Sequence, residues 1–228
     1  MNKTLQSFYS KQIKILAFDV DGTLFSSEAI ILDTYVESIQ KFSINSGKKV
    51  IVPTKEKILE QVGLPVKQIF QNLLPELSES ERDSISDNVL RLLCEKIFEK
   101  KGMLYKGVAE TIRELHSRDY LLCIASNGRA AYINAILEAY NLKEYFQELI
   151  VIDYVSIRSK GDILKGYLSN FQKTGLSALM IGDRKSDLDA ALEAESPFAF
   201  CEYGHAEPNE INLYSIKLQS ISDLLAIF

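Results

Sequence analysis

Cysteine is scarce in this 228-residue chain, which holds only Cys94, Cys123 and Cys201, far apart in the sequence. An odd number of cysteines, far apart in the sequence, supports neither a disulfide framework nor a CxxC zinc site. We therefore expect a protein of a reducing, cytoplasmic environment.

Long apolar runs are missing as well. No stretch approaches the roughly 18 consecutive apolar residues that a membrane helix needs. Asp19 interrupts the best candidate for a signal-peptide core. We expect a soluble protein that has no membrane partner.

An excess of positive charge is also absent, because 26 basic residues face 31 acidic ones and the net charge is −5. Such a chain has no overall field that attracts nucleic acid, so we expect no nucleic-acid partner. An anionic substrate would need a local binding site. Hydrophobic residues at 46% and charged residues at 25% are ordinary globular composition, which excludes a disordered or collagen-like chain.

What the chain does contain is a series of short apolar runs, each followed by polar or glycine residues. Runs this apolar are typical of strands buried on both faces of a parallel sheet. Helical patterns lie between them, and this alternation predicts an α/β fold with a doubly wound parallel sheet. Ligands of such folds bind at the carboxyl ends of the strands. The expected strands are IKILAFDV from Ile13, YLLCIASNG from Tyr120, LIVIDY from Leu149, SALMIGD from Ser177 and PFAFCEYG from Pro197.

One long interval near the N-terminus is helical in its periodicity throughout and exceeds an ordinary crossover. The length of the chain, at about 150 residues per domain, also suggests between one and two domains. We therefore predict a core made of residues 1–25 and 103–228, with residues 26–102 as a helical insertion. Ser78 and Glu81 form a capping-box pattern inside the insertion.

Two aspartates stand in the motif DVDGT, which follows the first expected strand. Residues two apart in a strand point to the same side, so Asp19 and Asp21 can both reach the crevice where the chain turns at Gly22. Two carboxylates held that close repel each other unless a cation lies beside them. The motif therefore indicates a metal site.

Two more aspartates come from GDRKSD, after the apolar run LMI. A spacing of four places Asp183 and Asp187 on one face if a helical turn begins there, whereas Asp189 is expected to face solvent. Together with Asp19 and Asp21 they make an all-oxygen site that suits Mg²⁺.

Two further features suit a phosphate group. Ser126 and Asn127 lie in SNG directly after an apolar run, where a hydroxyl and a backbone amide can donate hydrogen bonds. Lys160 lies at the start of an expected helix, where its charge opposes the helix dipole, so a functional reason for it is stronger than a structural one. Arg158 and Lys165 are the alternative cations.

The four motifs, in this order and each after an apolar run, resemble those of the haloacid dehalogenase-like (HAD) hydrolase superfamily. The resemblance extends over nearly the whole chain and is strongest to the phosphoglycolate-phosphatase-like branch, which has a helical cap of the C1 type after the first motif. It implies a Rossmann-like core and a Mg²⁺-dependent phosphatase that acts on a small phosphorylated metabolite. Gly161 follows Lys160 where many relatives have proline.

The resemblance also implies roles for the motif residues. Asp19 would be the nucleophile that forms an aspartyl-phosphate, and Asp21 the general acid and later the general base. The metal would be held by Asp19, Asp183 and Asp187, with the backbone carbonyl of Asp21. Asp187 could instead orient Lys160. The phosphate-binding residues that it implies are Gly22, Thr23, Ser126, Asn127 and Lys160.

Two alternatives stay open. A phosphomutase of the β-phosphoglucomutase kind would keep both Asp19 and Asp21, and a catalytically silent interaction domain would keep the fold alone. His205, in a loop after the last expected strand, is interpreted as a surface turn residue, and Cys123 as a small core residue. Arg184 could reach solvent or the cap, and no motif in the cap names the substrate.

Overall fold

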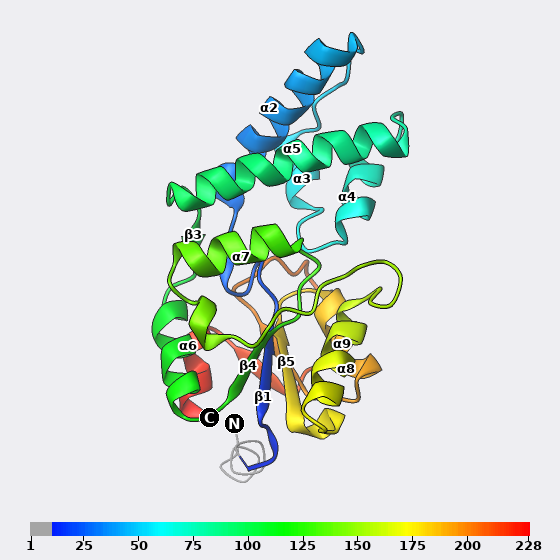
Figure 1. Cartoon of the computed structure of the whole chain (residues 1–228). Coiled ribbons are helices and arrows are strands. Elements are labelled where there is room, and N and C mark those ends of the chain that lie inside the picture. Colours follow the sequence, from blue (N-terminus) through cyan, green and yellow to red (C-terminus); the bar gives the residue numbers. More distant parts are fainter. Residues whose placement is uncertain (1–10) are drawn as a thin grey trace.

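A parallel sheet forms the centre of the lower half of the molecule (Figure 1). The structure, a computed structural model, describes residues 11–228, so the first ten residues of the predicted core segment lie outside it. Within the described range the strand order is β4-β1-β5-β6-β7, with parallel pairing throughout, which confirms the predicted α/β class. The strands are β1 Ile15–Phe18, β4 Leu121–Ile124, β5 Ala178–Gly182, β6 Phe198–Cys201 and β7 Ile216–Leu218.

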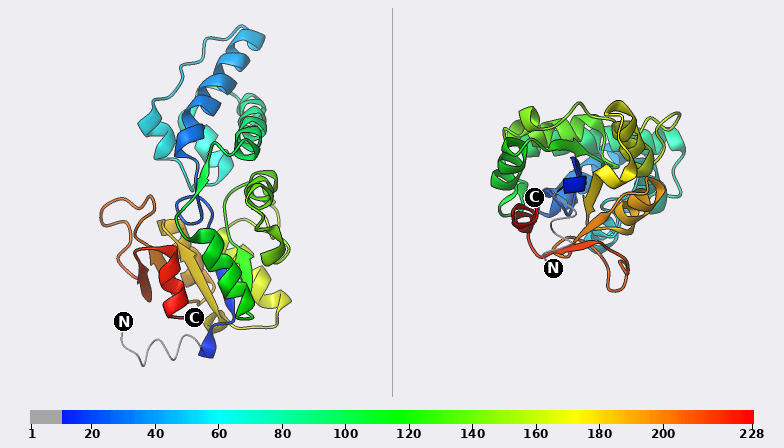
Figure 2. Two further views of the ribbon diagram at one scale, coloured as in Figure 1. Left: turned by 90° about the vertical axis from the view of Figure 1, so that its left-hand side faces the viewer. Right: turned by 90° about the horizontal axis from the view of Figure 1, so that it is seen from below.

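Helices cover both faces of the sheet (Figure 2). Leu16 and Phe18 of β1 pack against α6, α7 and the short helix η3, whereas Ile15 and Ala17 pack against α8 and α9. Successive side chains of a strand point to opposite faces, so a strand covered on both sides is apolar along its whole length. The covering helices are α6 Val108–Ser117, α7 Ala130–Ala139, α8 Lys160–Asn170, α9 Lys185–Glu193 and η3 Ile221–Ala226, with η1 Lys143–Tyr145 and η2 Gly175–Ser177 as short turns between elements.

The predicted strand LIVIDY is wrong, because residues 149–154 run as irregular chain beside α8. The Tyr167 hydroxyl of α8 accepts a hydrogen bond from the Ile150 amide at 3.1 Å and donates one to the Glu148 carbonyl at 3.0 Å. Asp153 then accepts three amide hydrogen bonds from the turn that follows it, each of 2.8 Å. Of the expected strand, the Ile150 amide is thus bound to a side chain, and the fifth strand of the sheet is β7.

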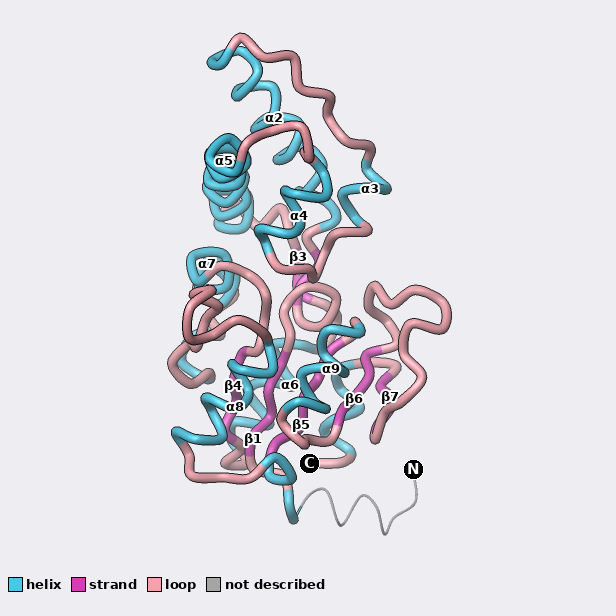
Figure 3. The backbone as a smooth tube through the Cα atoms, turned by 90° about the vertical axis from the view of Figure 1, so that its right-hand side faces the viewer, coloured by secondary structure: helices cyan, strands magenta, loops and turns pink. Residues whose placement is uncertain are grey.

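A second group of helices lies beyond the carboxyl ends of the strands (Figure 3). It has its own hydrophobic cluster, in which the rings of Tyr35 and Phe70 stack with centroids 5.5 Å apart. The predicted capping box of Ser78 and Glu81 is present, whereas residues 47–54 are a loop rather than helix. Across the described range, no helix combines the length and the apolar character that a membrane crossing requires. The helices of this group are α2 Glu28–Ser46, α3 Lys55–Leu59, α4 Val66–Leu73 and α5 Glu79–Phe98.

Two very short strands connect this helical segment to the sheet. β2 (Phe25–Ser26) and β3 (Met103–Leu104) pair in antiparallel fashion, so the chain enters and leaves the segment at one place. Gly102 lies against this pair, where a Cβ atom would come within 2.2 Å of the Phe25 ring. The division into a core and an insertion at residues 26–102 stays a prediction.

Candidate active site

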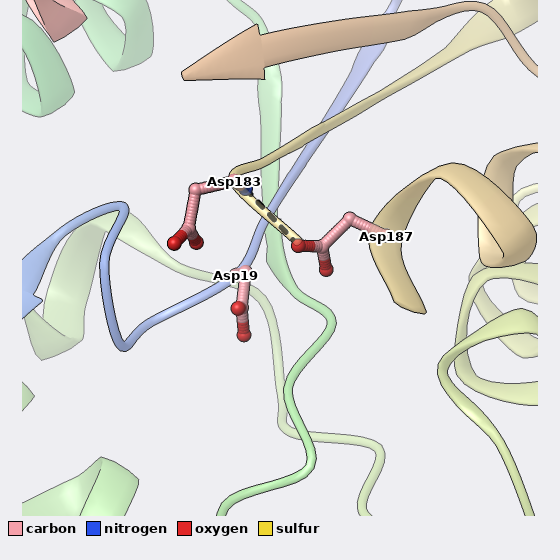
Figure 4. A group of neighbouring side chains, drawn as sticks. All are labelled: Asp19, Asp183 and Asp187. Atoms are coloured by element: carbon pink, nitrogen blue, oxygen red, sulfur yellow. Dashed lines mark hydrogen bonds between the residues drawn. The ribbon is translucent and has the colours of Figure 1, made fainter. Parts of the chain in front are cut away.

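Three buried carboxylates meet at the carboxyl ends of β1 and β5 (Figure 4). Asp19 follows β1, Asp183 follows β5, and Asp187 lies in the first turn of α9. One oxygen atom of each lies within 4.8 Å of the others, and each residue is at most 1% exposed. Because β1 and β5 are neighbours in the sheet, motifs more than 160 residues apart converge here.

Asp187 is fixed by hydrogen bonds from two directions. Its Oδ2 accepts from the backbone amides of Asp183 at 3.1 Å and Arg184 at 3.0 Å, which closes the first turn of α9. Its Oδ1 accepts from Lys160 Nζ at 2.7 Å. A carboxylate at a helix N-terminus is favoured by the helix dipole, so the same side chain begins the helix and holds the lysine.

Lys160 is the cation of the cluster. It is 2% exposed at the start of α8, and its Nζ forms ion pairs with Asp187 Oδ1 and, at 2.8 Å, with Asp19 Oδ2. Burial lowers the pKa of Lys160, but the charges of Asp187 and Asp19 outweigh burial and hold the pKa above its usual value. The alternative cations, Arg158 and Lys165, lie exposed elsewhere on the surface.

The cluster carries more negative than positive charge. Burial, and next the charge of Asp19, raise the pKa of Asp183, and burial raises the pKa of Asp187 although Lys160 opposes it. Three carboxylates facing one ammonium group leave an uncompensated negative charge in a region that excludes water. Their hard oxygen atoms suit Mg²⁺, so these residues fit a divalent cation.

The carboxylate of Asp183 is closely surrounded by hydrogen-bond donors and by the backbone of Gly22. Thr23 Oγ1 donates to Asp183 Oδ1 at 3.1 Å, and the His205 amide donates to Oδ2 at 2.7 Å. A Cβ atom on Gly22 would lie 2.1 Å from Asp183 Oδ2, and the φ angle of Gly22 is +78°. His205 does lie in a turn, as expected, but its amide contacts the site and its Nε2 lies 3.0 Å from Glu28 of α2.

The Asp21 carboxylate lies apart from the other three. Its Oδ1 accepts hydrogen bonds from Tyr132 Oη at 2.7 Å and Ser27 Oγ at 3.2 Å. Burial raises the pKa of Asp21 to about 6, although the Tyr132 hydrogen bond lowers it. Tyr132 was not predicted from the sequence. The signal for it was a tyrosine on the apolar face of α7, since a buried tyrosine hydroxyl needs a polar partner.

Ser126 and Asn127 are buried in the loop after β4. Ser126 Oγ accepts a hydrogen bond from the Gly128 amide at 3.1 Å, and its own hydrogen can still be donated. Asn127 Nδ2 instead donates to the carbonyl of Gly63, between α3 and α4, at 2.7 Å. Asn127 therefore joins the core to the helical segment.

Arg184 makes a second link to that segment. Its Nη1 donates to the Val62 carbonyl and its Nε to Glu210 Oε1, each at 2.9 Å. Glu210, which was not predicted from the sequence, also accepts a hydrogen bond from the Lys185 amide at 2.7 Å. Asp189 is 48% exposed at its side chain and pairs with Lys185, which agrees with its predicted solvent-facing position.

Known proteins resemble this chain over almost its whole length. A model of the haloacid dehalogenase-like hydrolase family matches residues 16–201. The chain is 31% identical over 219 residues to the pyrophosphatase PpaX of Listeria welshimeri and 25% identical over 231 residues to a phosphoglycolate phosphatase of Vibrio parahaemolyticus. Both alignments cover 95% of this chain and 96% of the relative.

The fold is shared with a solved structure as well. The crystal structure of a predicted phosphoglycolate phosphatase from Haemophilus somnus 129pt matches with a TM-score of 0.82 at 19% identity. The match covers 95% of this chain and 98% of that chain. At this level of identity the likeness concerns the fold.

Proposed function

The chain belongs to the haloacid dehalogenase-like hydrolases, in their phosphoglycolate-phosphatase-like branch, and from this premise we propose that it is a Mg²⁺-dependent phosphatase of small phosphorylated metabolites. One observation carries the proposal. Lys160 lies between Asp19 and Asp187, beside a buried group of carboxylates that fits a divalent cation. Such an arrangement can neutralise a phosphoryl group and orient the carboxylate that attacks it.

In the first proposed step, a carboxylate oxygen of Asp19 attacks phosphorus and an aspartyl-phosphate forms. The bond between phosphorus and the leaving oxygen breaks, and Asp21 gives that oxygen its proton. A pKa of about 6 supports this role, because a useful fraction of Asp21 is protonated near neutral pH. In the second step Asp21 takes a proton from the water that hydrolyses the aspartyl-phosphate.

The remaining residues would bind and neutralise the phosphoryl group. Lys160 and the Ser126 hydroxyl would contact its oxygen atoms, assisted by backbone amides near Gly22. Bound Mg²⁺, held by Asp19 and Asp183, would supply further positive charge to the phosphoryl oxygens. Asp187 lies behind Lys160 and would position its ammonium group.

We also propose that residues 26–102 act as a cap that excludes water from the site. The hydrogen bonds from Asn127 to Gly63 and from Arg184 to Val62 support this, since they hold the α3–α4 loop against the core. A cytoplasmic location belongs to the same proposal and is supported by the three unpaired cysteines among the described residues.

The test is hydrolysis of p-nitrophenyl phosphate with and without Mg²⁺. We expect activity only with Mg²⁺, and a loss of at least 10³-fold in Asp19→Asn, which keeps the shape of the side chain but is not a nucleophile. Asp119→Asn is the matched control, because Asp119 is exposed in a left-handed conformation that asparagine also adopts. Equal activity in Asp19→Asn would remove the mechanism. Isomerisation of sugar phosphates without release of phosphate would indicate the phosphomutase instead.

A further inference from the structure

A cavity of about 90 Å³ lies between the helical segment and the core, next to the proposed catalytic residues. Asp21 and Ser126 are among the residues that line it. The rest of the wall comes mainly from α2, α4, α5 and α7 and from the loop between α3 and α4. A leaving group attached to the phosphorus atom would enter this cavity, since Asp21 is the proposed proton donor to its oxygen.

The wall of the cavity is largely apolar. Tyr35 and Phe70, whose rings stack on each other, form part of it. The short polar groups on the wall include the hydroxyls of Ser27 and Ser86. The aliphatic residues on the wall include Ile31, Val62, Leu64, Ile69, Val89 and Leu93.

The cavity offers little positive charge to a leaving group. Among the described residues that line it, Arg129 is the single lysine or arginine. Its Nη1 already lies 2.7 Å from Asp87 Oδ1 on α5. A carboxylate or a second phosphate in the cavity would lose its water, face the carboxyl group of Asp21 and compete with Asp87 for Arg129, which is unfavourable for a buried anion.

We propose that the leaving group is an uncharged and mainly apolar alcohol, so that the substrate is a phosphate monoester with no second anionic group. The inference rests on the proposed phosphatase function and names the substrate class of that site. In the reaction, the bond between phosphorus and the alkoxy oxygen breaks, Asp21 protonates that oxygen, and the phosphoryl group passes to Asp19 and then to water. The products are the neutral alcohol and inorganic phosphate.

This substrate class differs from those in the names of the similar proteins. Pyrophosphate and phosphoglycolate would both place an anionic group in the cavity. The chain shares 31% and 25% identity with the two relatives named for these compounds, which leaves ample room for a different cavity wall. The preference among substrates is therefore the quantity to measure.

The first experiment compares kcat/KM of the wild-type protein with Mg²⁺ for n-propyl phosphate, 2-phosphoglycolate and inorganic pyrophosphate. We expect n-propyl phosphate to be preferred at least tenfold over both anionic substrates. A preference for either anionic substrate overturns the inference. Hydrolysis of p-nitrophenyl phosphate in the same preparation separates the two claims, because its presence keeps the phosphatase function even when the inference fails, and its absence removes both.

The second experiment adds a cation to the wall. Leu64→Arg places a guanidinium group in the cavity from a partly exposed loop position, where the fold tolerates it. We expect the ratio of kcat/KM for n-propyl phosphate to that for phosphoglycolate to fall at least tenfold. Leu213→Arg, at a residue that is 55% exposed before β7, is the matched control and should leave the ratio unchanged. An unchanged ratio in a folded Leu64→Arg protein contradicts the inference.

Discussion

The carboxylates of the motif aspartates differ in what they contact. Those of Asp19, Asp183 and Asp187 share one buried space with Lys160, whereas that of Asp21 accepts hydrogen bonds from Tyr132 and other hydroxyls. The first group faces a fixed positive charge, and Asp21 faces hydroxyl donors and a cavity. Under the proposed mechanism, charge neutralisation and proton transfer fall to separate places, although Asp19 and Asp21 are only two residues apart in the sequence.

Substitution of Asp21 should separate these two tasks. Asp21→Asn can still accept a hydrogen bond from Tyr132 but cannot protonate a leaving alcohol. We expect kcat/KM for an alkyl phosphate to fall by about 10²–10⁴-fold, because that is the usual contribution of general acid catalysis. Hydrolysis of p-nitrophenyl phosphate should fall less in single-turnover measurements of the first step, since nitrophenolate leaves without a proton. Equal losses for both substrates would contradict the role of Asp21 as the acid.

Asp183 should lower the stability of the metal-free protein. In Asp183→Asn the amide oxygen can accept from the His205 amide, and the Thr23 hydroxyl can rotate to accept from the new NH₂ group. Removing one buried charge should raise the free energy of unfolding in EDTA by on the order of 2 kcal/mol. The thermal shift that Mg²⁺ produces in the wild type should be lost. A melting temperature in EDTA below that of the wild type would count against the charge argument.

At the scale of residues, the motif positions could be predicted from the sequence and their partners could not. Asp19 follows β1, and Asp183 and Asp187 follow β5, so neighbouring parallel strands bring them to one edge of the sheet. Lys160 begins α8 after a segment that is not a strand. Tyr132 lies outside the motifs, and its hydrogen bond to the site depends on the rotation of α7 about its own axis. Such contacts are set by packing, which local sequence patterns do not contain.

The α3–α4 loop is one of the elements that connect the helical segment to the site. Its carbonyl groups at Val62 and Gly63 accept hydrogen bonds from Arg184 and Asn127 of the core. Gly63 has a φ angle of +88°, which a side chain would strain. The loop therefore presents its backbone, rather than its side chains, to the two core residues.

Loss of these two hydrogen bonds should loosen the loop without unfolding the protein. Each hydrogen bond contributes about 1 kcal/mol, so the double variant Asn127→Ala/Arg184→Ala should increase amide hydrogen exchange across residues 60–66 by about tenfold or more. Exchange in β1 and β5 should stay as in the wild type. Arg113→Ala, which removes an exposed arginine of α6, is the control. Unchanged exchange in the loop would show that other contacts hold it.

At the scale of elements, the long apolar runs predicted the central strands. The length of an apolar run was a poor guide in two cases, one long run that is not a strand and one short strand. LIVIDY is as apolar as a strand, yet it runs as irregular chain, and its Ile150 amide donates to the Tyr167 hydroxyl of α8. β7 has the pattern IKL with an exposed Lys217 and was not predicted, because an edge strand three residues long hardly differs from a loop in sequence. Which segment joins the sheet depends on competition for hydrogen bonds in the folded chain.

For the molecule as a whole, the buried acidic groups should determine how metal-free stability depends on pH. Burial raises the pKa of Asp183 and Asp187, and that of Asp21 to about 6, from an ordinary value of 3.8. Between these values the folded chain binds more protons than the unfolded chain. Stability must therefore increase as pH falls through this window.

In EDTA we expect the free energy of unfolding to rise by about 1 kcal/mol per pH unit as the pH falls from 6 to 4.5. With saturating Mg²⁺ the rise should disappear, because the ion favours the charged carboxylates. Urea unfolding at three pH values, with and without the ion, measures both slopes. A metal-free protein that loses stability over this interval would refute the expectation.

The pairing of β2 with β3 has a consequence for how this chain can be altered. Since the helical segment begins and ends within one antiparallel pair, its removal leaves two chain ends that already lie side by side. A short turn between Phe25 and Leu104 would close the core, and a foreign segment could be grafted at the same junction. Under the proposed function, the catalytic residues of the core and the part of the cavity wall on α2, α4 and α5 could thus be recombined as separate modules.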